Sequence, residues 1–425
     1  MNPNIPQTTQ KRIVIVGAGF GGLKLARKLS NSAYQVVLLD KNNFHQFQPL
    51  FYQVATAGLE PSSISFPLRK IFQGVENIHI RVAEVESIDT DKNLIHSSLG
   101  EIPYDELVIS IGCDTNYFGM ESIQKNAIPM KSVSEALALR NKILQNFEDA
   151  LLIENPTELQ TMMNFVIVGG GATGVEISGT LAEMKIHVLP KDYPELDFGK
   201  MNIYLLEASP RTLNVMSEVS ARKSRDYLEK MGVIVKTDTQ VKEYNGKNVV
   251  LGDGSIIEAN NLIWAAGVTG NKLAGFKPES VTKSNRLKVD QFNKVEGYEN
   301  IYALGDIASM ADEKYPNGHP QVAQPAIQQG VNLGKNFLNK LNNKPLKPFI
   351  YKDLGSMATI GRNLAVAELP FFKFQGFFAW LLWLFVHLMS IVGVKNRLFI
   401  FINWVSSYFT HDQSLRLILK AKTKA

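Results

Sequence analysis

Residues suited to binding a phosphate group occur near the start of the chain. Gly17, Gly19 and Gly22 form a Gly-x-Gly-x-x-Gly pattern directly after the apolar run at residues 13–16, and Asp40 ends the next apolar run. Glycine lets the backbone approach a pyrophosphate, a helix that begins among the glycines attracts its charge, and the acid accepts hydrogen bonds from a ribose. The pattern predicts a strand, a tight turn, a helix and a second strand that together bind a dinucleotide.

A second pattern of the same kind follows in the middle of the chain. Gly169, Gly171 and Gly174 come after the apolar run at residues 165–168, and Glu207 ends the next such run. The interval before Glu207 is longer than in the first pattern, because a loop containing prolines and acidic residues is inserted there. A single pattern could be an ordinary tight turn. Two of them, each between a predicted strand and a predicted helix, indicate two dinucleotides bound by one chain, with electrons passing between them.

The composition sets the class of protein. The chain has 425 residues, of which 45% are hydrophobic and 20% charged, as expected for a folded protein of two or three domains. Because Cys113 is the only cysteine, a disulfide framework, a redox pair of cysteines and a cysteine-ligated zinc site are excluded. We expect it to be a small buried residue, and we expect no metal and no nucleic acid partner. Residues 1–10 are polar and do not resemble a secretory signal, which predicts a cytoplasmic location.

Further motifs extend over nearly the whole chain. They lie at residues 47–58, 115–119, 264–268, 302–306 and 323–330. Together with the two glycine patterns, they make the chain resemble the type II NADH:quinone oxidoreductases. These are single-subunit, non-proton-pumping respiratory NADH dehydrogenases of the two-dinucleotide-binding-domain flavoprotein superfamily. The most specific motif is Ala-Gln-x-Ala-x-Gln-x-Gly at residues 323–330, which is associated in this family with the quinone site.

The resemblance implies a role for each dinucleotide pattern. The first pattern is expected to hold FAD, non-covalently, and the second to hold NADH. Asp40 and Glu207 then contact the two riboses, and an acid at the second position favours NADH because it repels the 2′-phosphate of NADPH. Asp306 is implied to bind the ribityl chain of the flavin, while its alternative role is that of a helix N-cap.

Three polar side chains are candidates for the reaction itself. The resemblance implies that Glu176 lies near the nicotinamide and the flavin, whereas an acid at this position could also only favour the helix dipole. Gln324 and Gln328 lie four residues apart and share one helix face, and the resemblance assigns both amides to the quinone. By pattern alone they would form an exposed polar face. Gln321 and Gln329 are weaker candidates.

The C-terminal region is apolar, aromatic and basic. Residues 371–425 carry seven basic residues and one acidic residue, and residues 374–394 are almost entirely apolar. This composition favours peripheral helices that lie in the surface of an anionic membrane, at the cytoplasmic face of the cell membrane. The alternatives are a transmembrane span and a buried helix with a solvated basic tail. We expect His387 to make a packing or headgroup contact.

The sequence therefore predicts an α/β fold with two Rossmann-like dinucleotide-binding domains and a C-terminal helical membrane anchor. Residues 1–120 and 290–345 are expected to form a discontinuous FAD domain, residues 121–289 an inserted NAD(H) domain, and residues 346–425 the anchor. The expected function is NADH oxidation coupled to quinone reduction, with a homodimer left open. Alternatives are a reductase of a soluble acceptor such as ferredoxin or rubredoxin, and an NADH-sensing binding protein at the membrane surface. A sulfide:quinone oxidoreductase would need a redox cysteine pair.

Overall fold

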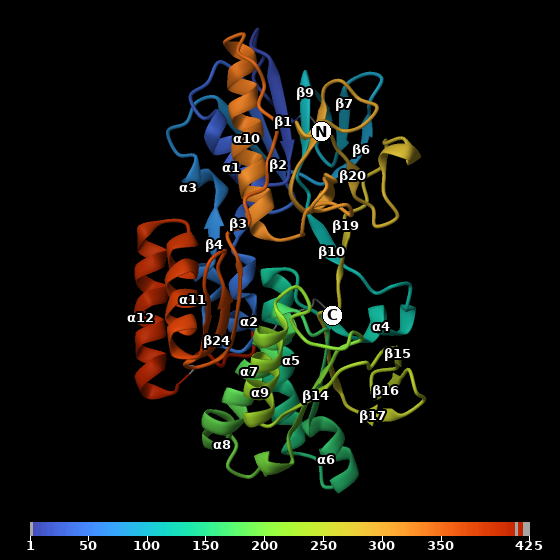
Figure 1. Cartoon of the computed structure of the whole chain (residues 1–425), viewed down its shortest axis with the longest axis vertical. Helices are drawn as coiled ribbons and strands as arrows, with labels where there is room; N and C mark the ends of the chain where they lie inside the picture. The colour runs from blue at the N-terminus through green and yellow to red at the C-terminus, as the bar shows by residue number, and fades with distance from the viewer. Residues whose placement is uncertain (1–2, 413–414, 420–425) are drawn as a thin grey trace. The chain divides into compact units, whose positions relative to one another are not determined.

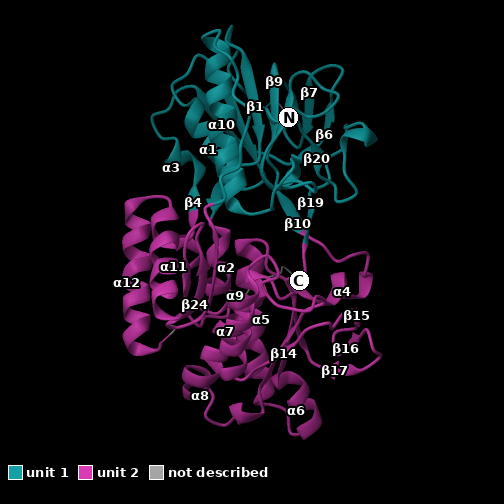
Figure 2. Ribbon diagram, in the orientation of Figure 1, with its two compact units in different colours: residues 1–46, 66–114, 268–353 teal, residues 47–65, 115–267, 354–425 magenta. Residues whose placement is uncertain are grey.

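The chain forms an α/β structure that divides into two compact units. The computed structural model describes residues 3–412 and 415–419. Unit 1 consists of Met1–Gln46, Phe66–Asp114 and Val268–Asp353, and unit 2 of Phe47–Ser65, Thr115–Gly267 and Leu354–Ala425 (Figure 1, Figure 2). Each unit contains one of the two glycine patterns.

Unit 1 is built on a five-stranded parallel sheet. Its order is β21-β9-β1-β2-β5, with the strands β1 (Arg12–Val16), β2 (Gln35–Asp40), β5 (Ile78–Val82), β9 (Glu106–Ile109) and β21 (Ile301–Ala303). The central strands are almost wholly buried runs of Val, Ile and Leu, as expected for a parallel sheet that is covered on both faces. Consequently the first glycine turn leaves the carboxyl end of a central strand, where ligands bind in folds of this kind.

Two long helices of unit 1 pack closely along each other. They are α1 (Phe20–Leu29) and α10 (Ala323–Leu341), which lie side by side in Figure 1. A Cβ atom at Gly330 would lie 2.4 Å from the carbonyl oxygen of Gly21, so only glycine allows this approach. The glycine that ends the Ala-Gln motif is therefore a packing residue.

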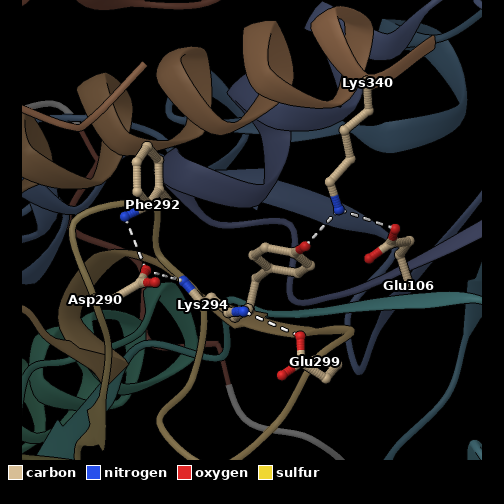
Figure 3. A network of polar contacts seen from close by, with 7 residues as sticks. Glu106, Asp290, Phe292, Lys294, Glu299 and Lys340 are labelled. Carbon is tan, nitrogen blue, oxygen red and sulfur yellow. Dashed lines mark hydrogen bonds and ion pairs between the residues drawn. The ribbon is translucent and has the colours of Figure 1, made fainter. Parts of the chain in front are cut away.

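A polar network fixes the C-terminal end of α10 to the sheet (Figure 3). The Lys340 ammonium lies 3.2 Å from Glu106 Oε1 and donates to the Tyr302 hydroxyl at 2.7 Å. Burial and the nearby Glu106 carboxylate both raise the pKa of Tyr302, so its phenol stays neutral. Because Glu106 belongs to β9 and Tyr302 to β21, the helix is tied to two strands at the edge of the sheet.

The remaining elements of unit 1 are short. An antiparallel sheet of three strands contains β6 (Val85–Asp89), β7 (Leu94–Ser97) and β8 (Gly100–Pro103). A parallel pair contains β20 (Leu287–Lys288) and β22 (Ala308–Ser309). The helix α3 spans Leu68–Ile71. Where the chain passes between the units it forms β3 (Phe44–Gln46), β4 (Ser65–Pro67), β10 (Cys113–Thr115) and β19 (Val268–Gly270).

Unit 2 repeats the same parallel architecture. Its sheet has the order β11-β18-β12-β13-β14, with β11 (Ile128–Pro129), β18 (Asn261–Trp264), β12 (Asn164–Val168), β13 (Asn202–Leu206) and β14 (Val233–Lys236). Its helices include α2 (Phe51–Ala55), α4 (Glu121–Asn126), α5 (Val133–Ala150), α6 (Pro156–Met163), α7 (Ala172–His187), α8 (Leu189–Asp192) and α9 (Glu218–Lys230). An antiparallel sheet contains β15 (Val241–Tyr244), β16 (Asn248–Leu251) and β17 (Ile256–Glu258). Two Rossmann-like halves, as predicted, are thus present.

The C-terminal residues form a module that belongs to unit 2. It contains a three-stranded antiparallel sheet and two helices: β23 (Ser356–Gly361), β24 (Leu364–Glu368), β25 (Lys373–Gln375), α11 (Phe377–Ser390) and α12 (Val394–Thr410). Within the described ranges no helix combines the length and the apolar character that crossing a bilayer requires. The structural boundaries also differ from the predicted domain ranges. Residues 268–289 fold with unit 1, and the module packs on α7 and α9 of unit 2.

The module is seated on the helix that follows the second glycine pattern. Strand β23 runs against α7, and a Cβ atom at Gly179 would lie 1.6 Å from the carbonyl oxygen of Ile360. Backbone therefore meets backbone at this point, with no room for any side chain. Gly179 is the residue that allows the C-terminal module to dock.

We predict that Gly179→Ala lowers the thermal stability of the protein. In an open helix, alanine would stabilise by about 0.5–1 kcal/mol over glycine, whereas overpacking a tight contact costs about 1–3 kcal/mol. Because the added Cβ atom would clash with Ile360, we expect the free energy of unfolding to decrease. The midpoint of thermal unfolding measures it, and Gly252→Ala is the matched control, because its added Cβ would find its nearest neighbour at 3.5 Å. Equal midpoints for the two variants would show that α7 and β23 are not in contact.

Candidate functional site

The first glycine turn lies between β1 and α1 in unit 1. Gly17 has a φ of +100°, and a Cβ atom there would lie 2.3 Å from the carbonyl oxygen of Ser110. Gly19, which precedes α1, has no atom within 4 Å of the position its Cβ would take. The turn is thus closed on its protein side and open at the helix N-terminus. This shape fits a pyrophosphate, which needs bare backbone N–H groups beside a helix dipole.

Asp40 ends β2 next to this turn. Its carboxylate accepts hydrogen bonds from the backbone N–H groups of Ala18 and Asn42, both at 2.7 Å. Burial raises the pKa of Asp40, and these two hydrogen bonds oppose the rise. The carboxylate is therefore held beside the glycine turn, as a ribose acceptor would have to be. Its contact with a ribose stays a prediction.

Asp306 lies in a turn that follows β21 in the same unit. Its Oδ2 lies 2.9 Å from Cys113 Sγ, which donates the hydrogen bond. The preceding N–H, of Gly305, donates to the side chain of Gln329 at 2.7 Å. These contacts hold the turn in place. The family resemblance implies that Asp306, in this turn, binds a flavin. Gln329, a weaker candidate from the sequence, is 1% exposed and holds the turn.

The two predicted quinone ligands on α10 differ in their surroundings. The Gln328 amide forms a bidentate pair with the backbone of Lys352, donating to its oxygen at 2.8 Å and accepting from its N–H at 3.0 Å. The Gln324 amide has no hydrogen-bond partner among the described residues. Gln324 is therefore the more available of the two for a ligand, a difference that spacing alone does not reveal.

The second glycine turn, in unit 2, repeats the first. Gly169 has a φ of +110°, and its Cβ would lie 2.5 Å from the carbonyl oxygen of Ala265. Gly171 is open, as Gly19 is. Glu207, after β13, accepts hydrogen bonds from the N–H of Gly170 and from both the N–H and the hydroxyl of Ser209. Despite the inserted loop, this acid stands beside its glycine turn just as Asp40 does.

Glu176 is buried on α7 and faces the C-terminal module. The N–H of Thr359 lies 3.4 Å from its Oε1, and the indole N–H of Trp383 points toward the carboxyl without reaching hydrogen-bond geometry. Burial raises the pKa of Glu176 to about 8, against the weaker opposing effect of these two groups. At neutral pH the carboxyl is therefore protonated and can donate a hydrogen bond or a proton. Its position in a buried site argues against a simple helix-dipole role.

His387 shares this site through Trp383. The two rings stack at 3.9 Å, and His387 Nδ1 donates to the carbonyl oxygen of Trp383 at 2.7 Å. Burial lowers the pKa of His387 to about 4, so the ring is neutral at physiological pH. The expected packing contact of His387 is present, whereas the position of its partner Trp383 beside the Glu176 carboxyl was not predicted. The i to i+4 spacing of Trp383 and His387 on one apolar helix face was the available signal.

Sequence reasoning also missed Glu183 and Tyr52. Glu183 follows Glu176 by two helical turns and lies on the same face of α7. It accepts a hydrogen bond from the N–H of Arg362, in the turn between β23 and β24. Tyr52, in α2, lies within electrostatic range of both carboxyls. Residues 176–183 have the spacing Glu-x-x-Gly-x-x-x-Glu. This spacing identifies the buried face of α7 only after the structure shows that Gly179 contacts β23.

Comparisons with known proteins agree over almost the whole chain. The pyridine nucleotide-disulphide oxidoreductase family matches residues 11–330, and the NDH2 C-terminal domain matches residues 354–411. The type II NADH:quinone oxidoreductase Ndh of Mycobacterium tuberculosis is 33% identical, over 96% of this chain and 91% of that protein. The type II NADH:quinone oxidoreductase NdhA of the same organism is 34% identical, over 93% and 87%.

Solved structures show the same fold. The structure of NDH2 from Plasmodium falciparum in complex with NADH has a TM-score of 0.89 at 21% identity, over 97% of this chain and all of that one. The sulfide:quinone oxidoreductase of Aquifex aeolicus has a TM-score of 0.69, also at 21% identity, over 94% and 95%. The C-terminal module is matched together with the two Rossmann-like halves, and relatives above 30% identity span the same length. This chain belongs to the type II NADH:quinone oxidoreductase family.

Proposed function

We propose that this protein oxidises NADH and passes the two electrons through FAD to a membrane quinone, without pumping protons. The observation that carries the proposal is the burial of Glu176, on the helix that begins at the second glycine turn and beside Trp383 of the C-terminal module, which raises the pKa of its carboxyl to about 8. An acid that is protonated at neutral pH suits the reduction of a quinone, whose oxygens must gain protons. A reductase of a protein acceptor, or a sensor that only binds NADH, needs neither the buried acid nor this module.

The residues of unit 1 fit FAD. FAD, when bound, supplies the two-electron chemistry that links a nicotinamide to a quinone. The open backbone at Gly19 and the N-terminus of α1 would hold its pyrophosphate, and Asp40 would hold its ribose. Asp306, fixed by Cys113, would bind its ribityl chain. Gly17 and Gly22 are required for the turn itself, because added Cβ atoms would strike the neighbouring backbone.

The residues of unit 2 fit NADH. Gly169 and Gly174 close the turn, Gly171 leaves it open, and the N-terminus of α7 faces the opening. Glu207 would accept hydrogen bonds from the adenosine ribose and repel a 2′-phosphate. No general base is needed here, since hydride transfer depends on orientation of the two rings.

We predict that Glu207→Gln weakens NADH binding and relaxes the preference for NADH over NADPH. Loss of hydrogen bonds to a charged group costs about 1.5–3 kcal/mol, which is roughly a tenfold to hundredfold rise in the dissociation constant. Steady-state kinetics with both nucleotides measure the change. Glu218→Gln, at an exposed carboxylate of the same unit, is the control. If the nucleotide preference stays as in the wild type, Glu207 is not the ribose acid.

Within unit 2, Glu176 and His387 are the candidates for the acceptor side. The overall reaction, NADH + H⁺ + quinone → NAD⁺ + quinol, consumes one proton per turnover. Glu176 is neutral at pH 7 and can donate a proton toward a quinone oxygen, and the neutral ring of His387 adds no charge to the site. Gln324 can donate an amide hydrogen bond, whereas Gln328 has its amide paired with Lys352.

We predict that Gln324→Ala slows flavin oxidation by a short-chain quinone about three- to tenfold, the effect of one neutral hydrogen bond. Reduction of the flavin by NADH should change little. Stopped-flow absorbance separates these two half-reactions. Gln328→Ala is the comparison, and it should lower the thermal midpoint because the Lys352 contact is lost. A wild-type protein whose reduced flavin is not oxidised by any quinone would rule out the proposed function.

We also propose that α11 and α12 bind the protein to the cytoplasmic face of an anionic membrane. Large apolar side chains of both helices are exposed, among them Phe378 (72%), Phe385 (63%) and Phe409 (76%). A protein surface rarely leaves so many such side chains in water unless it binds a partner or a membrane. Lys395 and Arg397 add positive charge at the start of α12, whereas Lys420, Lys422 and Lys424 lie outside the described residues.

Replacing Phe378, Phe385 and Phe409 with Asp is expected to release the protein from anionic liposomes, because apolar burial is lost and like charges face each other. NADH oxidation by a soluble acceptor should persist. Co-sedimentation with vesicles measures binding, and Ile256→Asp is the control, since Ile256 is 57% exposed on β17 of the same unit. If the triple variant still sediments with vesicles, or high salt alone strips the wild type, the apolar faces are not the anchor.

A further inference from the structure

The motif at residues 115–119 is held firmly against the end of β18, within unit 2. The backbone N–H of Asn116 donates to the carbonyl oxygen of Gly267 at 3.0 Å. The Trp264 indole N–H donates to the carbonyl oxygen of Asn116 at 2.8 Å. The Tyr117 ring is stacked on the same indole, with 6.2 Å between the ring centroids. These contacts fix the backbone of the motif.

Phe118 is the residue that this fixed segment presents to solvent. It is 61% exposed, although its side chain is large and apolar. Its φ is +52°, in the left-handed region that residues other than glycine rarely adopt. The Asn116 side chain stabilises this conformation, because its Oδ1 accepts from the Phe118 N–H at 2.8 Å. An exposed aromatic ring on a strained and well-fixed backbone is typical of a residue that binds a ligand.

The Phe118 ring lies next to the segment that closes the second glycine turn. Its Cζ atom is 3.2 Å from the position that a Cβ atom would take at Gly267, so the tip of the ring is close to bare backbone. Two residues earlier, the carbonyl oxygen of Ala265 closes the turn at Gly169. The short stretch at residues 265–267 therefore borders the dinucleotide turn at one end and the aromatic ring at the other.

The order of the sheet decides which half of a dinucleotide the ring would meet. Strand β12, which leads into the turn, lies between β13 and β18. Glu207, which follows β13, is proposed to hold the adenosine ribose, and the pyrophosphate would lie at the turn itself. The other half of NADH must then extend to the opposite side, toward the end of β18, where Phe118 lies. That half is the nicotinamide with its ribose.

We propose that the Phe118 ring packs against the nicotinamide of NADH and orients it. The inference rests on the proposed function, because it takes the second glycine turn as the NADH site. An aromatic side chain offers a large and rigid contact to the flat nicotinamide ring. Because the backbone of Phe118 is already fixed, little conformational entropy is lost when the nicotinamide binds. Phe118 takes part in no bond change, and its effect on hydride transfer comes from orientation of the ring.

The test compares one ligand that has a nicotinamide ring with one that lacks it. Full-length, flavin-loaded protein carrying Phe118→Asn is titrated with tetrahydro-NADH, an analogue that cannot transfer a hydride, and with ADP-ribose. Asparagine readily adopts a positive φ, so the segment keeps its conformation while the ring is lost. We expect the dissociation constant of tetrahydro-NADH to rise about three- to tenfold, the effect of one aromatic contact. That of ADP-ribose should change by less than about 1.5-fold, because the adenosine side is untouched.

Two further variants serve as controls. Phe118→Tyr keeps the aromatic ring and should bind both ligands as the wild type does. Leu152→Ala removes an exposed apolar side chain elsewhere in unit 2, since Leu152 follows α5 and is 80% exposed. It should also leave both dissociation constants unchanged.

Stopped-flow absorbance gives a second readout in the same variants. At saturating NADH, flavin reduction in Phe118→Asn should slow by about threefold or more, because a misplaced ring reacts more slowly even when it is bound. Oxidation of the reduced flavin by a short-chain quinone should stay within about twofold, since the nicotinamide takes no part in it.

Two results for Phe118→Asn would overturn the inference. Equal weakening of tetrahydro-NADH and ADP-ribose would mean that the ring supports the turn and not the nicotinamide. Unchanged binding together with unchanged flavin reduction would mean that the ring meets no part of NADH. In both cases the wild type still binds the two ligands, and the proposed NADH site stands. A wild type that binds neither ligand would instead refute the proposed function at this turn, and the inference with it.

Discussion

The contact between α7 and β23 determines most of what this structure can do. Backbone meets backbone at Gly179 and Ile360, where no side chain fits. The same helix begins at the second glycine turn and carries Glu176 on the face that β23 covers. One helix therefore begins at the glycine turn that we propose binds a dinucleotide, and its side is covered by the C-terminal module. Removing the module would expose a carboxyl and an apolar helix face together, which explains why the two parts fold as one unit.

Burial of acids is the main electrostatic feature of this contact. Glu176 and Glu183 both have a raised pKa because the module removes them from water. Leaving a carboxylate charged in such a place would be costly, so the neutral form is favoured. The folded pKa of Glu176 lies above the unfolded value, so its contribution to stability is intact below about pH 4.5 and weakens as pH rises toward about 8. A site suited to donate protons is thus a site that destabilises the protein in alkali.

The two Rossmann-like halves could be predicted from the sequence, because the residues that determine each of them lie in one stretch of the chain. Strand, glycine turn and acid follow one another along the chain in each half. The amino-acid pattern alone therefore places Asp40 beside the first turn, where it accepts from Ala18, and Glu207 beside the second, where it accepts from Gly170. The contact of Gln328 with Lys352 could not be predicted, because it depends on where a distant loop returns. The site at Glu176 could not be predicted either, because Thr359 and Trp383 come from the C-terminal module and belong to no recognised sequence motif.

Helix α11 shows why hydropathy alone cannot distinguish a helix at the membrane surface, a transmembrane span and a buried helix in the C-terminal region. Ala379 is buried against Ala365 and Ala367 of β24, and Trp383 is buried against Tyr52 of α2. Phe378 and Phe385, on other sides of the same helix, are exposed. A helix that is apolar all round has no polar stripe to indicate which face meets protein. The helix therefore needs two apolar neighbours, which are β24 and α2 on one side and, on our proposal, lipid on the other. The short length of the helix then follows, because a segment lying along a surface need only match the protein that it covers.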